Sequence, residues 1–208
     1  MSNHPEEKTS FIAEARREQI MNGAIATLDE IGYAQSSLSQ IAKRAGVSTA
    51  LISYHFVDKS DLMNHLLMKL MERSATYIMD RVAQATTARQ KLDTFIEASL
   101  AYQGTNPAHY IALLEIVFHA RTPDNISYYR VEDDEDVIQH ELQQILREGQ
   151  ATGEFSSFHV EVLASMIQGA VGEYMSSAAI TRQVDLETYG QELIRMVRTI
   201  TIRTEGIS

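Results

Sequence analysis

The residues in this sequence that could carry out acid–base or metal chemistry are seven histidines and 28 aspartates and glutamates. Its 208 residues include no cysteine. A helical di-iron carboxylate site needs Glu-x-x-His pairs, which place both ligands on one helix face. No histidine here has a glutamate three residues before it. The common motifs for nucleotide binding, zinc hydrolysis and serine acyl transfer are absent too. We therefore expect no enzyme activity, no catalytic residue, no metal site and no cofactor.

The acidic run EDDED, Glu132 to Asp136, is a weaker candidate for cation binding. Adjacent carboxylates repel one another, and a divalent ion would relieve that repulsion. The run lacks the glycine and the spaced oxygen ligands of a calcium loop. We interpret it as the solvated start of a helix, where acidic side chains favour the positive end of the helix dipole.

A second kind of chemistry, hydrogen bonding to a partner, is concentrated in the stretch AGVSTALISYHFVDKSDL, Ala45 to Leu62. The apolar spacing predicts that three of its side chains point inward: Val47, Ile52 and Phe56. Four small or polar residues then face outward: Thr49, Ala50, Ser53 and Tyr54. Such a face suits a helix that enters the major groove of DNA, where hydroxyls reach base edges and phosphates. A helical hairpin whose exposed residues happen to be small fits the periodicity equally well.

The elements that position this stretch are predicted to be helices. Apolar residues recur at spacings of three and four nearly throughout, with only three prolines and ten glycines. We expect an all-α fold of about nine helices, over Ser10 to Gly32, 37–45, 48–55, 60–85, 88–102, 107–120, 131–151, 158–181 and 185–203. Two short helices joined by Ala45-Gly46-Val47 predict a helix-turn-helix, because the glycine permits the turn.

Composition bounds the possible partners and location. The formal net charge of −10 argues against nonspecific coating of nucleic acid, and residues 1–62 carry six basic against eight acidic residues. Any DNA binding must therefore depend on a few placed groups. The absence of cysteine, of an apolar leader and of a stretch of about 20 apolar residues predicts a soluble cytoplasmic protein with no membrane partner.

The segment SSLSQIAKRAGVSTALISYHFVDKSDL resembles the TetR family of bacterial transcriptional regulators, over about 45 residues from the first helix to Leu62. The resemblance implies that Ser37 and Tyr54 hold the phosphate backbone, with His55 close by and Lys59 at the start of the fourth helix. It places Thr49, Ala50 and Ser53 in the groove, with Leu51 against an apolar base edge. Ser48, the predicted cap of the recognition helix, completes this DNA-binding set. The family often has Lys or Arg in place of Thr49 and Tyr in place of Ser53, so the resemblance does not imply an operator sequence.

The same resemblance implies a division into a disordered N-terminus (1–9), a helix-turn-helix domain (10–60) and a ligand-binding and dimerisation domain (61–208). Polar groups on apolar helices are the candidate ligand contacts: Tyr102, Tyr110, Glu115, His119, Tyr174 and Met175. Each of them is also consistent with an ordinary core role, and a carboxylate at Glu115 fits either a cationic effector or an internal partner such as His119 or an arginine. Small residues on the last helices are candidates for a dimer interface, or for close packing within one subunit: Ala164, Gly169, Ala170, Gly172, Ser176 and Ala179.

Together these features predict a homodimeric repressor that binds a near-palindromic duplex operator and is released by an unidentified small-molecule effector. Two other classes remain open from the sequence. A helical-bundle enzyme would show turnover. A helical adaptor would keep the fold without binding DNA, although Tyr54 and Lys59 argue against it.

Overall fold

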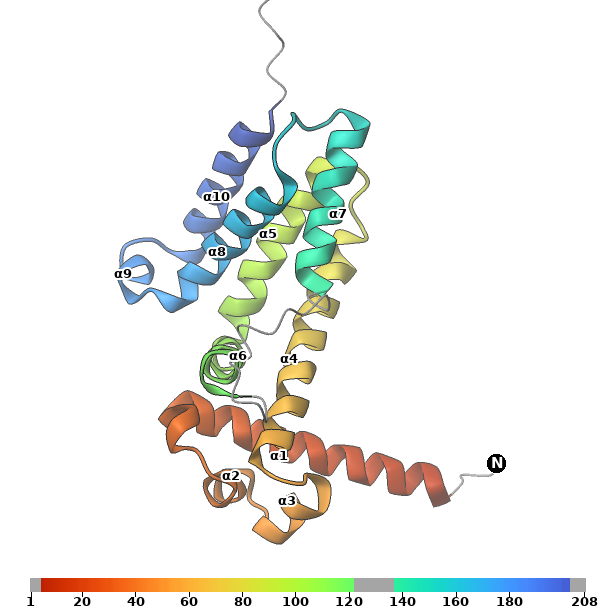
Figure 1. Cartoon of the computed structure of the whole chain (residues 1–208), viewed down its shortest axis with the longest axis vertical. Helices are drawn as coiled ribbons and strands as arrows, with labels where there is room; N and C mark the ends of the chain where they lie inside the picture. Colours follow the sequence, from red (N-terminus) through yellow and green to blue (C-terminus); the bar gives the residue numbers. More distant parts are fainter. Residues whose placement is uncertain (1–4, 122–136, 203–208) are drawn as a thin grey trace, which may run out of the picture. The chain divides into compact units, whose positions relative to one another are not determined.

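The computed structural model describes residues 5–121 and 137–202, and these form helices joined by short turns (Figure 1). The helices are α1 (Pro5–Gln35), α2 (Leu38–Ala45), α3 (Thr49–His55), α4 (Lys59–Val82), α5 (Ala88–Thr105), α6 (Pro107–His119), α7 (Val137–Thr152), α8 (Val160–Ser176), α9 (Ala178–Thr181) and α10 (Leu186–Thr201). The predicted all-α class is confirmed. None of the helices in the described segments combines the length and the apolar character needed to cross a membrane.

The first of two compact units contains residues 1–71 and 108–132. Its core is built from the predicted apolar stripe of α1, with Ile20, Ala24 and Leu28 at 1% exposure or less. Ile41 of α2 and Ile52 of α3 close over this stripe, and α6 contributes Ile116. α1, α2 and α3 are thus held by one continuous apolar cluster.

Two glycines shape this unit. Gly46 ends α2 with φ +66°, a left-handed conformation that glycine adopts without strain, and so makes the turn between α2 and α3. Gly23 lies where α1 meets α2, and a Cβ added there would lie 2.6 Å from the Cβ of Ala45. The two helices can approach this closely only because Gly23 has no side chain.

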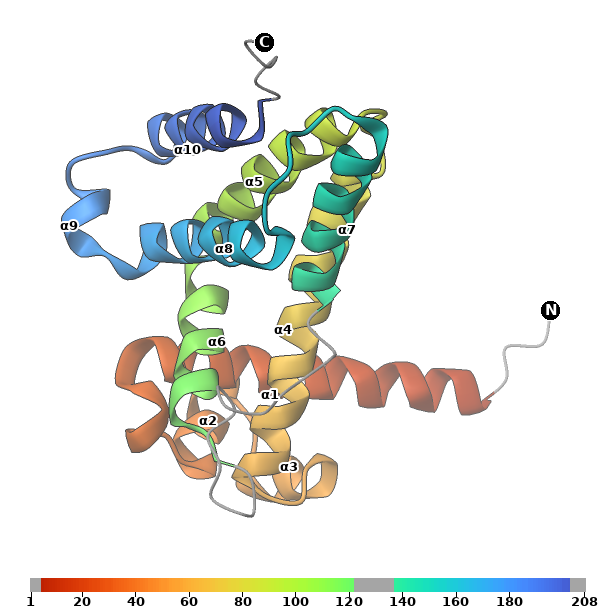
Figure 2. The same ribbon diagram turned by 45° about the horizontal axis from the view of Figure 1, so that its top comes forward.

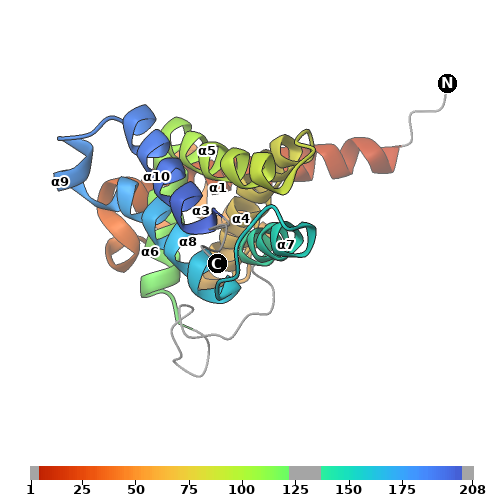
Figure 3. The same cartoon turned by 90° about the horizontal axis from the view of Figure 1, so that it is seen from above.

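The second unit contains residues 72–107 and 133–208. In it α5 packs against α7, α8 and α10, as the turned views show (Figures 2 and 3). The core includes Phe95 and Ile96 of α5, Leu146 of α7 and Ile167 of α8. α6, which was expected to belong with this sensor portion, packs with the first unit instead. The functional boundary near residue 60 stays a prediction.

Some element boundaries differ from the sequence prediction. α1 begins at Pro5 rather than near Ser10, and it is broken at Gly32, where the sequence placed its end. Pro5 suits the first helical position, because its missing N–H would have had no partner there. The expected helix over 158–181 is split at Ser177 into α8 and α9, so the described residues form ten helices rather than about nine. Residues 131–136, the start of the expected seventh helix, lie outside the described residues.

Candidate nucleic-acid interface

Serine caps define both helices of the helix-turn-helix. Ser37 Oγ accepts the N–H of Gln40 at 3.3 Å, and Ser48 Oγ accepts the N–H of Leu51 at 3.1 Å. Each bond satisfies one of the backbone donors that a helix start leaves free. Because α3 has only seven residues, its first turn depends strongly on Ser48.

α3 is anchored by its apolar side. Ile52 is fully buried, and Phe56, just after the helix, is 2% exposed, while Val47 is half-buried. The inward positions predicted from the sequence are therefore confirmed. The ring of His65 in α4 lies edge-on to Phe56, with 5.5 Å between the centroids.

The opposite side of α3 is open. Ser48, Thr49, Ala50, Ser53 and Tyr54 are exposed, and Tyr54 is 81% exposed, far more than a tyrosine that fills a core. Leu51 and His55 are half-buried, and the His55 ring lies 5.0 Å from that of Tyr54 in an edge contact. The exposed set forms a small, uncharged face on one helix. Whether these residues contact DNA stays a prediction.

Lys59 lies at the start of α4, as expected, but its ammonium makes contacts that the sequence did not indicate. Its ammonium donates to the carbonyl oxygens of Tyr33, near the end of α1, at 2.7 Å and of Ser36, in the turn before α2, at 2.8 Å. It also lies 4.1 Å from the centroid of the Tyr33 ring. Burial lowers the pKa of Lys59 from its ordinary value. Lys59 therefore joins the start of α4 to the turn before α2, which leaves at most one of its three N–H donors for a phosphate.

A carboxylate fixes the other end of the motif. Asp61 in the first turn of α4 accepts the N–H of Val57 at 2.9 Å. The Nδ1 atom of His65, one turn later, lies 3.2 Å from the second oxygen of the same carboxylate. The segment that follows α3 is thereby tied to α4.

Two further cations lie on α2. Arg44 is paired with Glu30 of α1, so its charge serves the packing of α1 against α2. Lys43 is exposed and makes no ion pair within the described residues. Lys43 was not among the residues singled out from the sequence, although its place in the last turn before Gly46 could have indicated it.

Three candidate ligand residues lie in the first unit. Glu115 accepts the N–H of Tyr33 at 2.7 Å, and His119 Nδ1 lies 3.3 Å from the same carboxylate oxygen. Of the two roles that the sequence left open for Glu115, the structure shows an internal partner. Tyr110 is half-buried on α6.

The other three lie in the second unit. Tyr174 is buried, and its hydroxyl donates to the Val184 carbonyl at 3.2 Å. Met175 packs against the core cluster. Tyr102 is half-buried beside Tyr77, with ring centroids 5.3 Å apart, and burial raises the pKa of its phenol. The six candidates are therefore divided between the two units, three in each.

The candidate dimer residues also differ in their surroundings. Ala164 is fully buried within its own subunit, so it is removed from any proposed interface, while Ala170 and Gly172 are half-buried. Gly169, Ser176 and Ala179 are exposed. Small residues permit close helix packing inside a subunit as well as between subunits, and sequence alone does not separate the two.

No cluster of three or more metal-binding side chains occurs in the part of the chain that the structure describes. The acidic run Glu132 to Asp136 lies outside that part.

Comparison with known proteins agrees with the helix-turn-helix geometry. Residues 20–66 match the family of bacterial regulatory proteins named for TetR. The regulator BetI of Pectobacterium carotovorum is 30% identical over 95 residues, which cover 45% of this chain and 49% of BetI. BetI of Stenotrophomonas maltophilia is 39% identical over 69 residues, 31% of this chain and 35% of that protein. The chain thus spans about half or less of the curated relatives that it matches.

Solved structures extend the likeness of fold to nearly the whole chain. The fatty acid degradation regulator FadR of Bacillus halodurans has a TM-score of 0.75 at 22% identity, covering 95% of this chain and 96% of its own. FadR of Bacillus subtilis, in complex with stearoyl-CoA, has a TM-score of 0.71 at 23% identity, covering 89% and 99%. These similarities establish a shared all-helical fold.

Proposed function

We propose that this chain, which belongs to the TetR family of bacterial regulatory proteins, is a homodimeric DNA-binding repressor released from its operator by a small-molecule effector. The observation that carries the proposal is the exposed face of α3, anchored from behind by Ile52 and Phe56. In two copies related by a two-fold axis, these helices would enter successive major grooves of a near-palindromic site.

The small, uncharged face of α3 supports recognition of DNA bases through short-range contacts rather than through charge. Thr49 and Ser53 offer hydroxyls to base edges, and Ala50 and the half-buried Leu51 offer apolar contact. Tyr54, Ser37 and the exposed Lys43 are placed by the proposal against phosphates, which fix the register of the protein on the duplex. Lys59 contributes by holding the turn before α2 and offers at most one donor to a phosphate.

The dimer proposal is supported by apolar side chains on α8 and α10, two helices that pack against each other. Val162 and Met166 are 57% and 56% exposed, and Met196 and Ile200 are 52% and 45% exposed. Each pair is spaced four residues apart and so lies on one face of its helix. Gly169 continues the α8 stripe, and a Cβ added there would meet no atom within 4 Å apart from the adjoining backbone of its own helix. Apolar side chains exposed in such numbers are typical of protein interfaces.

The effector is proposed to act on the second unit. This proposal is supported by the shared fold with B. subtilis FadR, whose structure holds stearoyl-CoA. The chemical class of the effector here is not implied by that likeness. In the proposed scheme the effector changes DNA affinity only through its different affinity for the two states of the dimer.

In vitro selection from a random 30-base-pair duplex library tests the function. Selected duplexes should share a near-palindromic sequence and bind at least about 1,000-fold more tightly than a scrambled duplex at physiological salt. Their affinity should fall linearly with salt concentration on logarithmic axes. Equal binding of selected and scrambled duplexes would overturn the proposal.

A further inference from the structure

The break in α1 leaves a backbone donor that α6 satisfies. Gly32 has φ +71° and ψ +172°, a conformation outside the helical region, so the helical ladder is interrupted just before Tyr33. The Tyr33 N–H points instead to Glu115 Oε2, at 2.7 Å, across 82 residues of sequence. A Cβ on residue 32 would lie 3.1 Å from the same oxygen, so the absence of a side chain at Gly32 keeps this approach open.

The same peptide segment is held from its other side. The Tyr33 carbonyl accepts a bond from Lys59 Nζ at 2.7 Å and a second from the Ser36 hydroxyl at 2.8 Å. Tyr33 is therefore fixed through its N–H by α6 and through its carbonyl by the start of α4. Ser37, the cap of α2, follows four residues later, so the position of Tyr33 determines where the helix-turn-helix begins.

The Glu115 carboxylate is itself restrained. Its side chain is only 28% exposed, and His119 Nδ1 lies 3.3 Å from the oxygen that accepts the Tyr33 bond. His119 Nδ1 also lies 3.1 Å from the Glu115 carbonyl oxygen, which fixes the imidazole one turn along α6. Hydrogen bonds to an ionised acceptor are stronger than neutral ones, and partial burial strengthens them further.

We infer that Glu115 is a positioning residue for DNA recognition, one that fixes the turn before α2 by holding the Tyr33 N–H. This inference rests on the proposed function. In the sequence, Asn106 alone separates α6 from α5. Glu115 links α6 to the residues just before the helix-turn-helix through a hydrogen bond.

The test compares Glu115→Ala with Glu115→Gln, using a duplex selected by the wild-type protein and its scrambled form. Glu115→Ala should raise the Kd for the selected duplex about tenfold, within the range of coupling between sites in proteins. Backbone amides in residues 33–46 should exchange hydrogen faster in this variant. Glu115→Gln should recover most of the affinity, because its amide oxygen can still accept the Tyr33 N–H.

Glu154→Ala is the matched control. Glu154 also accepts backbone N–H groups, but it lies in the second unit, so its loss should leave the Kd within about twofold of wild type. An unchanged Kd for Glu115→Ala, or a defect in Glu115→Gln as large as in Glu115→Ala, would overturn the inference. Should Glu115→Ala fail to fold, Glu115→Asp takes its place: the shorter side chain keeps the charge but draws it away from Tyr33, and the same loss is expected.

Failure of the proposed function gives a different result. If wild-type protein selects no duplex, the repressor proposal falls. Hydrogen exchange in residues 33–46 then still shows whether Glu115 fixes the turn, since that measurement needs no DNA.

Discussion

Lys59 donates to the main-chain carbonyl of Tyr33 at 2.7 Å and lies 4.1 Å from the centroid of the Tyr33 ring. The cation thus neutralises the carbonyl dipoles that follow the break in α1 and stacks on an aromatic face at the same time. Lys59, which was expected to bind a phosphate, therefore stabilises the helix-turn-helix through contacts within the protein.

Replacing Lys59 should lower the free energy of unfolding clearly. It should change the salt dependence of DNA binding only slightly. Lys59→Met removes two charge-assisted hydrogen bonds and should reduce the free energy of unfolding by about 2 kcal/mol. Urea denaturation followed by circular dichroism measures this change. Full stability together with a salt slope reduced by about one would instead give Lys59 a purely phosphate-binding role.

Lys43 is the matched control for Lys59, because it is a lysine of the same unit. It is exposed and makes no ion pair in the described part of the chain. Lys43→Met should leave the free energy of unfolding within about 0.5 kcal/mol of wild type. It should weaken binding to all duplexes and reduce the salt slope by about one, as expected for the loss of one phosphate contact. Gel-shift titrations at four salt concentrations would reveal an unchanged slope if Lys43 does not face DNA.

Substitutions at Ser48 can distinguish an effect on stability from an effect on DNA binding. Ser48→Ala removes the bond to the Leu51 N–H and should cost about 1 kcal/mol. Ser48→Asn and Ser48→Asp should both restore the cap and the stability. Only Ser48→Asp should lose DNA affinity, because its carboxylate would face phosphates. Equal affinity of the Asn and Asp variants for the selected duplex would place Ser48 away from the DNA.

Local signals account for what the sequence predicted well. Ser37, Gly46 and Ser48 mark helix ends within a few residues of the bonds they make, so their roles could be inferred before the fold was known. The roles of Lys59 and Glu115 depend on Tyr33, which lies 26 and 82 residues away respectively. No periodicity encodes such a pairing, because it arises only when α1, α4 and α6 pack together.

The proposed dimer interface on α8 and α10 could not be predicted from the sequence either. Small residues were predicted to form the dimer interface because they allow helices to approach closely. Ala164, one of them, is fully buried inside its own subunit. Exposure rather than size singled out Val162, Met166 and Met196. Burial is a property of the packed structure, and the spacing of apolar residues on α8 did not distinguish its inner from its outer stripe.

A charge placed on that outer stripe should dissociate the dimer. Met166→Glu and Met196→Glu should each weaken association about 100-fold, since a buried, unpaired carboxylate at an interface costs several kcal/mol. Sedimentation velocity over a range of protein concentrations measures the change. Met68→Glu is the control: Met68 is 59% exposed on α4 in the first unit, so its replacement should leave the oligomeric state unaltered. Dimers that persist in both interface variants would place the interface elsewhere.

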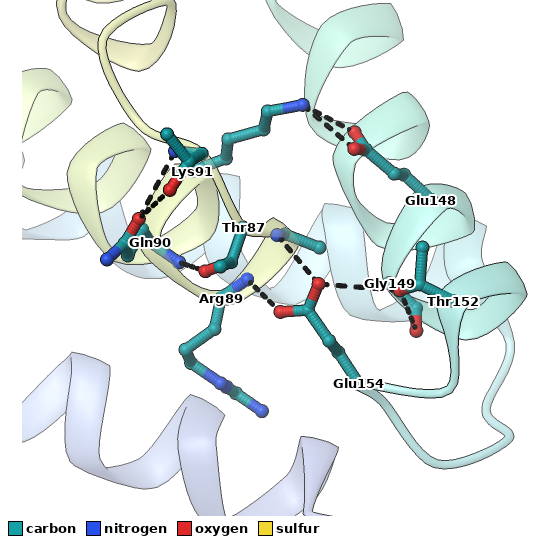
Figure 4. A network of polar contacts seen from close by, with 10 residues as sticks. Thr87, Arg89, Gln90, Lys91, Glu148, Gly149, Thr152 and Glu154 are labelled. Carbon is teal, nitrogen blue, oxygen red and sulfur yellow. Dashed lines mark hydrogen bonds and ion pairs between the residues drawn. The ribbon is translucent and has the colours of Figure 1, made fainter.

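Acid should destabilise the second unit through Glu154, which follows α7 and caps the start of α5 (Figure 4). Its carboxylate accepts the N–H of Arg89 at 3.0 Å and that of Ala88 at 3.1 Å. These bonds, that from Arg89 foremost, hold the pKa of Glu154 below its ordinary value.

Because the folded state favours the ionised carboxylate, the stabilisation from Glu154 is fully present above the ordinary carboxyl pKa of about 4.3 and is lost as the pH falls through the lower folded pKa. Glu154→Gln should therefore lower the unfolding temperature at pH 7, where it loses charge-assisted bonds worth about 1 kcal/mol. The difference from wild type should shrink as the pH falls below about 4.3, because wild-type Glu154 is then protonated progressively and loses its charge too. Thermal melts of both proteins across this range measure the difference, and a gap that stays constant with pH would show that the charge of Glu154 does not contribute.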